Sequence, residues 1–313
     1  MHITVGSRGS KLALWQANWV CGRLREAGFE AEIRVISTTG DRLATASQAQ
    51  PGGKGIFIRE IEEALAAGGA GGIDLAVHSL KDLPVDQPAG LYIAAIPGRE
   101  DARDALVAPQ SAAQTRFLDL PRGARVGTGS PRRGFQLLHL RPDLEVVAIR
   151  GNVDTRLRKL ERGDYDALVM AAAGLHRLGL AGRIGEYFSP EQICPAPGQG
   201  ALAIEIRRGD ERTARAVEPL DDLPTRLATC AERAMLRRLG GGCQAPIAAY
   251  ATLDGDSIAI TGAVASPDGA RVIRARGQGA ADDPEAAGSR LAEELLKQGA
   301  GELLAPRAES PTC

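Results

Sequence analysis

Over its first two hundred residues the chain alternates short apolar runs with amphipathic stretches of helical period. This alternation is typical of α/β units around a largely parallel sheet. The segments 11–26 and 57–67 each carry apolar side chains on one helical face, among them Leu12, Trp15 and Trp19 in the first. Strands are predicted at residues 3–5, 31–36, 73–77, 91–96, 125–126, 146–149, 167–170 and 202–206.

At 313 residues the chain exceeds what one hydrophobic core usually serves. Turn residues break the pattern near 97–98 and again at 194–198, which predicts paired crossovers between two domains. Domain 1 is expected to combine residues 1–96 with 198–217, and domain 2 to span 100–193. From 221 onward, a helix at 223–239, an antiparallel meander turning at 254–255 and 267–269, and a helix at 284–298 predict an α+β domain 3 over 221–313.

Composition excludes several classes of protein. The net charge of −1 gives no basic field for nucleic acid or an anionic membrane surface. No run approaches the roughly 18 apolar residues of a membrane span, and the first residues lack an apolar signal core, so a cytoplasmic location is expected. The four histidines and five cysteines show no metal-ligand spacing and no C-x-x-C pair, so neither a metal site nor a disulfide framework is predicted.

Three predicted strands end in loops that combine glycine, serine or threonine with arginine. These loops are GSRGS at 6–10, GTGSPRR at 127–133, and RGN at 150–152 with Arg156 a turn later. Backbone N–H groups and a helix N-terminus favour an anion there, and a guanidinium grips a carboxylate or phosphate. A solvated charge at a helix start explains any single arginine equally well. Three such loops in one α/β fold predict a site for a polyanion.

Two further positions are candidates for chemistry. Asp82 follows a buried strand run in HSLKDLP, where a carboxylate beside Lys81 suits acid–base work or cation stabilisation. An aspartate that only turns the chain before a proline fits the same spacing, and His78 equally fits a structural histidine. Cys243 follows three glycines on a predicted tight loop, where a thiol can be reactive, whereas Cys21 and Cys230 lie within predicted helices.

Taken together, these segments resemble the porphobilinogen deaminase, or hydroxymethylbilane synthase, family. The matching stretches are SRGSKLALWQA, TTGD, GGKGIFIREIE, DLAVHSLKDLP, GTGSPRRGFQ, IRGNVDTRLRKL, AAAGLHRLGL, APGQGALAIE and GGCQAPIAAYA. The resemblance implies an α/β fold with two domains similar to type II periplasmic binding proteins and a smaller α+β domain. It also implies a monomeric transferase that joins four porphobilinogen molecules head to tail with loss of ammonia.

The resemblance assigns roles residue by residue. It implies a dipyrromethane cofactor bound to Cys243 as a thioether, with Asp82 and Lys81 catalytic. It further implies that both of these residues bind the cofactor, together with Ser79, Thr128, Ser130, Arg132, Arg133 and Arg150. The substrate-binding residues that it implies are Arg8, Arg150, Arg156, Arg177, Gln16 and Gln199.

The chemistry fits these residue types. Each pyrrole ring carries an acetate and a propionate, so a chain of rings needs arginines. Loss of ammonia leaves a cationic azafulvenium, which a fixed carboxylate such as Asp82 can stabilise before it accepts a proton. The sequence departs from the family pattern at Pro131, where an aliphatic residue is common, and at Arg59, where a lysine is common.

A non-catalytic two-lobed receptor for a polycarboxylate anion is the alternative, because fold does not fix function. Such a receptor needs neither Cys243 nor a third domain. A transferase with a cysteine nucleophile would need a base beside the thiol, and no histidine is near Cys243 in the sequence.

Overall fold

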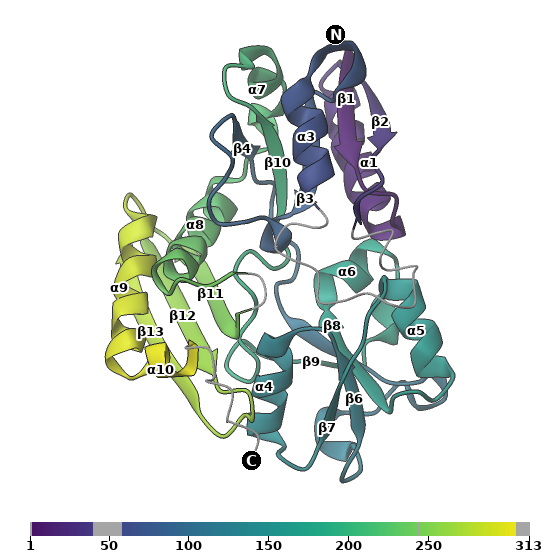
Figure 1. Cartoon of the computed structure of the whole chain (residues 1–313), viewed down its shortest axis with the longest axis vertical. Helices are drawn as coiled ribbons and strands as arrows, with labels where there is room; N and C mark the ends of the chain where they lie inside the picture. Colours follow the sequence, from purple (N-terminus) through teal and green to yellow (C-terminus); the bar gives the residue numbers. More distant parts are fainter. Residues whose placement is uncertain (1, 40–57, 243–244, 305–313) are drawn as a thin grey trace, which may run out of the picture.

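The computed structural model describes residues 2–39, 58–242 and 245–304. Its strands form three sheets, which Figure 1 shows as an upper α/β unit, a lower α/β unit and a third unit beside them. The combination of two α/β units with a smaller α+β unit confirms the expected fold class. We propose these units as domains with the boundaries expected from the sequence.

The first sheet has the order β2-β1-β3-β10-β4. Its side chains on one face pack against α1, and α3 packs near β1, β3 and β10. The elements are β1 (His2–Ser7), α1 (Lys11–Glu26), β2 (Glu30–Val35), α3 (Arg59–Ala67), β3 (Leu75–Ser79), β4 (Leu91–Ala95), β10 (Leu202–Arg207) and α7 (Glu211–Val217). The helix predicted at 57–67 therefore begins at Arg59, while residue 57 lies outside the described residues.

The second sheet has the order β7-β6-β8-β5-β9. Its elements are β5 (Asp104–Val107), β6 (Arg125–Thr128), α4 (Pro131–Leu140), β7 (Glu145–Ala148), α5 (Val153–Glu161), β8 (Ala167–Ala171), α6 (Ala172–Arg177) and β9 (Glu186–Tyr187). Sequence reasoning missed β5 and β9, while the eight strands that it predicted are all present, with bounds shifted by a few residues.

These two sheets are largely parallel, as expected, although each contains one antiparallel strand. In the first, β10 runs antiparallel to β3 and to β4. In the second, β5 runs antiparallel to β8 and to β9. The crossovers explain both reversals. The chain leaves β4 to enter the second sheet as β5 and returns as β10, so the strand that follows each crossover enters its sheet from the other unit.

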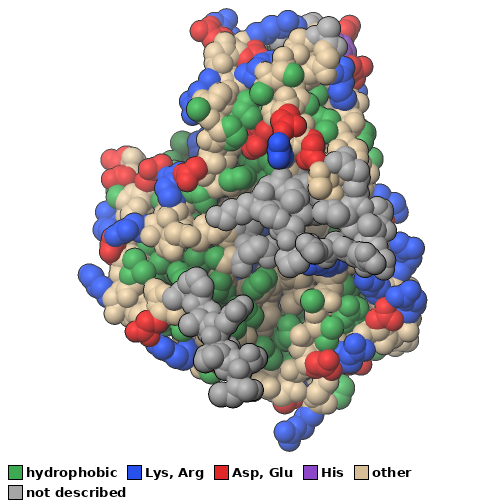
Figure 2. Space-filling view, in the orientation of Figure 1, with side chains coloured by type: hydrophobic (Ala, Val, Ile, Leu, Met, Phe, Trp, Pro, Cys, Tyr) green, Lys and Arg blue, Asp and Glu red, His purple; other side chains and the backbone are tan. Residues whose placement is uncertain are grey.

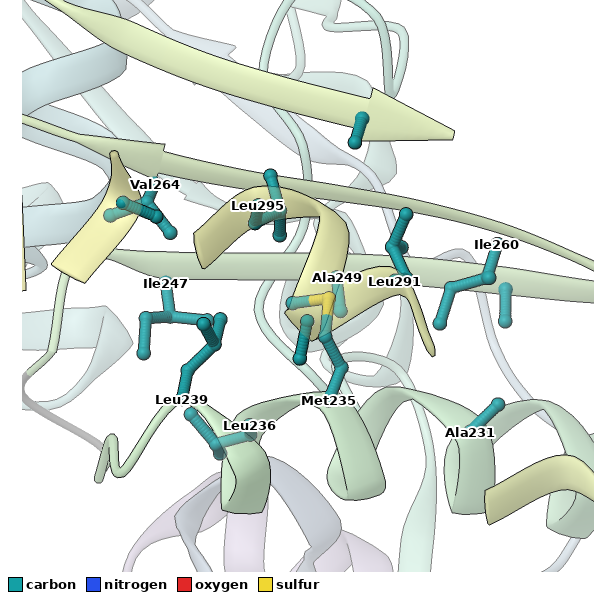
Figure 3. Packing of buried hydrophobic residues seen from close by; sticks show 14 of the residues in the cluster. Ala231, Met235, Leu236, Leu239, Ile247, Ala249, Ile260, Val264, Leu291 and Leu295 are labelled. Carbon is teal, nitrogen blue, oxygen red and sulfur yellow. The ribbon is translucent and has the colours of Figure 1, made fainter. Parts of the chain in front are cut away.

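The third unit is an antiparallel meander covered by helices, as predicted. It contains α8 (Leu223–Arg238), β11 (Ile247–Asp254), β12 (Ser257–Ala265), β13 (Val272–Ala280), α9 (Pro284–Lys297) and α10 (Ala300–Leu304). In Figure 3, Met235 points from α8 toward Ala249 of the sheet and Leu291 of α9. The two helices touch closely at Gly288, where a Cβ atom would lie 2.0 Å from the carbonyl oxygen of Ala231. Glycine is therefore required there.

Polar contacts at α8 join the third unit to both crossovers. Glu232 is fully buried and pairs with Arg99 of the first crossover at 2.7 Å. The same carboxylate accepts the Gly198 N–H of the second crossover at 2.7 Å and the Ala251 N–H of β11 at 2.8 Å. A buried charge with this many donors holds one geometry, because losing any partner leaves the carboxylate undersolvated.

The surface carries charges of both signs. Figure 2 shows acidic and basic side chains spread over one face, with basic groups gathered along the edge where α5 lies. None of the helices within the described ranges is both long and apolar enough to cross a membrane.

Candidate active site

A small cavity opens at the carboxyl ends of β1 and β3. These strands are parallel neighbours, with Val5 opposite Leu75, so the loops that follow them meet at one edge of the sheet. The loop after β1 ends at Ser10, whose hydroxyl caps α1 by accepting the Ala13 N–H. The loop after β3 is a short 3-10 turn, η2 (Leu80–Asp82). The cavity measures about 90 Å³ and is lined by Arg8, Ser10, Leu12, Ala13, Gln16, Ile58, Ile61, Val77, His78, Ser79 and Asp82.

The cavity thus combines a carboxylate and a guanidinium with apolar walls. Asp82 is exposed and Arg8 is partly buried. Gln16 is buried and donates a hydrogen bond from Nε2 to Ser79 Oγ at 3.0 Å, which fixes both side chains across the strand end. Four residues predicted for the site, namely Arg8, Gln16, Ser79 and Asp82, therefore line the same cavity.

A second group of predicted residues gathers around a carboxylate that sequence reasoning missed. Asp104, at the start of β5, is fully buried and lies 2.7 Å from Arg132 Nη1 and 2.7 Å from Arg133 Nε. Both arginines occupy the first turn of α4, which places their side chains at the carboxyl end of β6. Arg132 also donates to the carbonyl of Cys194 at 2.6 Å.

Gln199 of the second crossover connects these arginines to the Asp82 loop. Its side chain is fully buried, and its Oε1 accepts from Arg133 at 3.0 Å and from Lys81 at 3.4 Å. Its Nε2 donates to Asp104 at 2.8 Å and to the Ala102 carbonyl at 2.7 Å. The predicted residues Lys81, Arg133 and Gln199 are therefore in direct contact.

The pKa values in this group reflect burial first and the nearby charges second. Burial would raise the pKa of Asp104, but Arg132 and Arg133 overcome it and hold the pKa at about 2. Burial lowers the pKa of Lys81 to about 8, and Arg133 acts in the same direction against Asp82. Burial and Arg132 likewise lower the pKa of Arg133, although Asp104 opposes them. Positive charge is thus in excess here.

Arg156 of α5 belongs to the same electrostatic group. Burial and repulsion from Arg133 together lower its pKa to about 10, whereas Asp82 acts to raise it. Its Nε donates to the Gly151 carbonyl at 2.7 Å, which turns the side chain back over the start of its own helix. Arg150, just before this turn, is exposed.

The remaining predicted residues border this group. Arg177 is buried, donates to the Gly200 carbonyl at 2.6 Å and lies over the Trp15 ring at 5.9 Å. Burial lowers its pKa to about 10. Thr128 is buried at the end of β6, and its Oγ1 accepts the Ser130 N–H at 3.3 Å. Cys243, the predicted cofactor attachment point, lies outside the described residues.

His78 and Glu205 form a buried pair that sequence reasoning did not foresee. Both are almost inaccessible, and His78 Nε2 lies 3.2 Å from Glu205 Oε2 without the alignment of a hydrogen bond. Glu62 lies on the same side of the sheet, where burial and Glu205 raise its pKa. The structural interpretation of His78 suits its buried contact with Glu205, although the ring also lines the Asp82 cavity.

A larger, open depression of about 530 Å³ runs along α5. It is lined by Thr155, Leu157, Arg158, Lys159, Glu161, Arg162 and Arg183. None of the residues predicted for the site is among them. Across residues 2–39, 58–242 and 245–304, no group of three or more histidine, cysteine or acidic side chains is placed to hold a metal ion.

Comparison with known proteins decides between an enzyme and a receptor. Residues 3–215 match the family model described as "Porphobilinogen deaminase, dipyromethane cofactor binding domain", and residues 227–297 match "Porphobilinogen deaminase, C-terminal domain". The chain belongs to the porphobilinogen deaminase family. It is 50% identical over 312 residues to the porphobilinogen deaminase of Syntrophotalea carbinolica, covering 99% of this chain and 97% of that protein.

Other porphobilinogen deaminases are similarly close. That of Roseiflexus sp. is 50% identical over 305 residues, covering 97% of this chain and 98% of that protein. Among solved structures, an arginine transport periplasmic binding protein from Legionella pneumophila has a TM-score of 0.40 at 13% identity, covering 70% of this chain and 91% of that one.

The residues near the cavity fit the dipyrromethane cofactor of this porphobilinogen deaminase family member. Four cations, Lys81, Arg132, Arg133 and Arg156, stand against two carboxylates, Asp82 and Asp104. Burial and a neighbouring arginine lower the pKa values of Lys81, Arg133 and Arg156, so an anion that binds beside them stabilises their charged forms. A ligand with several carboxylates supplies that anionic charge.

Proposed function

We propose that this chain joins four porphobilinogen molecules head to tail, with loss of ammonia at each step, and releases the linear tetrapyrrole hydroxymethylbilane for haem biosynthesis. One observation carries this proposal beyond family membership. Asp82, at the edge of a cavity, lies within electrostatic reach of Lys81 and Arg156. Asp82 can balance the charge of a pyrrole cation, and it lies beside two cations that can bind the carboxylates of the pyrrole rings.

The cations bind and orient the rings. Repulsion from Arg133 contributes to the lowered pKa values of Lys81 and Arg156, and a substrate carboxylate placed beside either residue offsets it. The carboxylate therefore stabilises the charged form of the cation that binds it. Gln199 holds Lys81 and Arg133 on one oxygen, which keeps their spacing fixed before the substrate arrives. Such preorganisation avoids moving charges during the reaction.

Asp82 acts on the reacting ring. Its carboxylate balances the positive charge that develops on the pyrrole as ammonia leaves, and then accepts the α-proton of the ring that has attacked. The exposed position of Asp82 in η2 lets a ring reach it.

The dipyrromethane, bound through Cys243, supplies the pyrrole end to which substrate units are added. The other thiols in the described part of the chain are less suitable for attachment, because the thiolate is the reactive form of cysteine. Burial raises the pKa of Cys194 to about 12, and burial also raises the pKa of Cys21 and of Cys230. These three thiols are therefore held protonated at neutral pH.

An intact-mass measurement tests the proposal. The denatured, reduced protein should exceed its bare chain by two pyrrole units, with the excess on the peptide containing Cys243, because a thioether survives both treatments. Cys243→Ser should lack the thioether-linked mass and have little or no activity, whereas Cys21→Ser and Cys230→Ser should keep the mass. An unmodified mass for active wild-type enzyme would overturn the proposal in favour of a receptor.

We also propose that the enzyme is a cytoplasmic monomer that acts on a small molecule and on neither nucleic acid nor membrane. The net charge of −1 supports the exclusion of polyanionic surfaces as partners. Size-exclusion chromatography and cell fractionation test the oligomeric state and the location.

A further inference from the structure

The segment that follows Asp82 is stretched between two hydrophobic cores. Leu83 is 2% exposed and packs in the first α/β unit with Leu80 and Ile96. Val85, two residues later, packs against the core of the third unit. Asp82 is therefore the residue next to a short bridge from one unit to another, and the position of its carboxylate depends on how that bridge is held.

Arg233 of α8 holds this bridge through its backbone. Its Nη2 donates to the Pro84 carbonyl at 2.7 Å and to the Val85 carbonyl at 3.1 Å, and its Nη1 reaches the Leu83 carbonyl at 3.4 Å. The N–H donors of arginine have a rigid planar geometry. One guanidinium that binds three successive carbonyls therefore fixes the local backbone.

The helix that carries Arg233 is itself fixed. The adjacent Glu232 is tied to Arg99, Gly198 and Ala251, so α8 cannot shift without breaking buried charged contacts. The helix ends at Arg238, and Cys243 follows five positions later in the sequence. One helix thus grips the aspartate loop and leads toward the cysteine.

We propose that Arg233 is a positioning residue that sets the place of the Asp82 carboxylate relative to the third unit. This inference rests on the proposed function of Asp82. A displacement of about 1 Å at a reacting group can reduce a rate about a hundredfold, so a clamp on the neighbouring backbone affects turnover more than binding.

The test compares Arg233→Met and Arg233→Lys with Arg226→Met in the full-length holoenzyme. Arg226 is a matched control, because it also joins α8 to the first unit, but its side chain contacts Asp221 at 2.6 Å and the Ala94 carbonyl at 2.8 Å. Turnover of porphobilinogen, intact mass, thermal unfolding and hydrogen exchange of residues 78–87 are measured for each variant.

Arg233→Met should lower kcat about tenfold to a hundredfold with KM changed less than about twofold. It should keep the cofactor mass and speed exchange in residues 78–87, and Arg233→Lys should recover part of kcat. Arg226→Met should keep both kcat and the exchange rates. Three results would each overturn the proposed positioning role of Arg233. They are equal kcat in Arg233→Met and Arg226→Met, unchanged hydrogen exchange of residues 78–87, and an activity loss matched by a loss of cofactor mass. Failure of the wild-type enzyme to consume porphobilinogen would instead overturn the proposed function, while the exchange comparison still tests the clamp.

Discussion

At the scale of single residues, Asp82 combines an exposed side chain with a crowd of cations nearby. We predict that Asp82→Asn keeps the fold and lowers kcat by about 10²–10³, as expected when a preorganised charge at a reacting centre is removed. The amide retains size but cannot balance a pyrrole cation or accept its proton. Steady-state kinetics and thermal unfolding measure the two effects separately.

Asp164→Asn is a suitable control, because Asp164 is partly exposed and pairs with the exposed Arg162 on the surface of the second unit. It should leave turnover unchanged. If Asp82 merely turned the chain before Pro84, its substitution would lower the unfolding temperature and spare the rate, contrary to the prediction.

The sequence allowed Arg8, Ser79 and Asp82 to be placed at one edge, because residues after parallel strands converge there. It did not reveal Asp104 or Glu232. Their roles arise from partners 29 residues away, at Arg133, and 133 residues away, at Arg99. A buried pairing over such separations leaves no local pattern, since periodicity and turn residues report only near neighbours along the chain.

At the scale of elements, the predicted strands and helices were those with a clear period, and the missed ones were short. β9 has two residues and forms no recognisable apolar run. β5 contains the short apolar run Ala105–Val107 after the charged Asp104, and sequence reasoning passed over it. The direction of β10 was also beyond sequence reasoning, because it depends on the chain returning from another unit.

The second prediction concerns Arg156, in the N-terminal part of α5, and Arg150, just before this helix. Asn152 caps the helix by accepting the Thr155 N–H, which fixes the first turn and the base of Arg156. Arg156→Leu and Arg150→Leu should impair cofactor assembly or early elongation, because an apolar side chain leaves a ligand carboxylate unpaired. Arg156→Leu should not lower stability, since it removes a cation that Arg133 repels.

Arg158→Leu is the matched control on the same helix. Arg158 is exposed, donates to Thr155 Oγ1 and lines the open depression instead of the Asp82 cavity. In intact-mass and single-turnover assays, the Arg156→Leu and Arg150→Leu variants should therefore be impaired, whereas Arg158→Leu should behave like the wild type. Normal cofactor content and kinetics in all three variants would contradict the polyanion assignment.

At the scale of the whole molecule, polar contacts at the crossovers help to join the three units. Asp104 is central among them, because Gln199 of the second crossover and Arg132 and Arg133 of α4 all converge on its carboxylate. We predict that Asp104→Asn destabilises the protein by about 3–5 kcal/mol at pH 7, since it leaves buried guanidinium groups without their counter-charge. The midpoint of urea unfolding measures the change.

The pH dependence of this effect has a definite sign. The pKa of Asp104 is about 2 in the folded protein and 3.8 as its ordinary value, so its stabilisation is complete above pH 5 and is lost as pH falls through the folded pKa. The difference in free energy of unfolding between wild type and Asp104→Asn should shrink by about 1 kcal/mol at pH 3 and by about 2 kcal/mol once the carboxyl is fully protonated. Asp101→Asn, which removes a partly exposed pair with Arg103, should cost less than about 1 kcal/mol. A gap between wild type and Asp104→Asn that stayed constant from pH 7 to pH 3 would mean that folding does not lower the pKa of Asp104, and therefore that the arginines of α4 do not stabilise its charge. A gap that widened as the pH fell would mean that Asp104 is protonated in the folded protein.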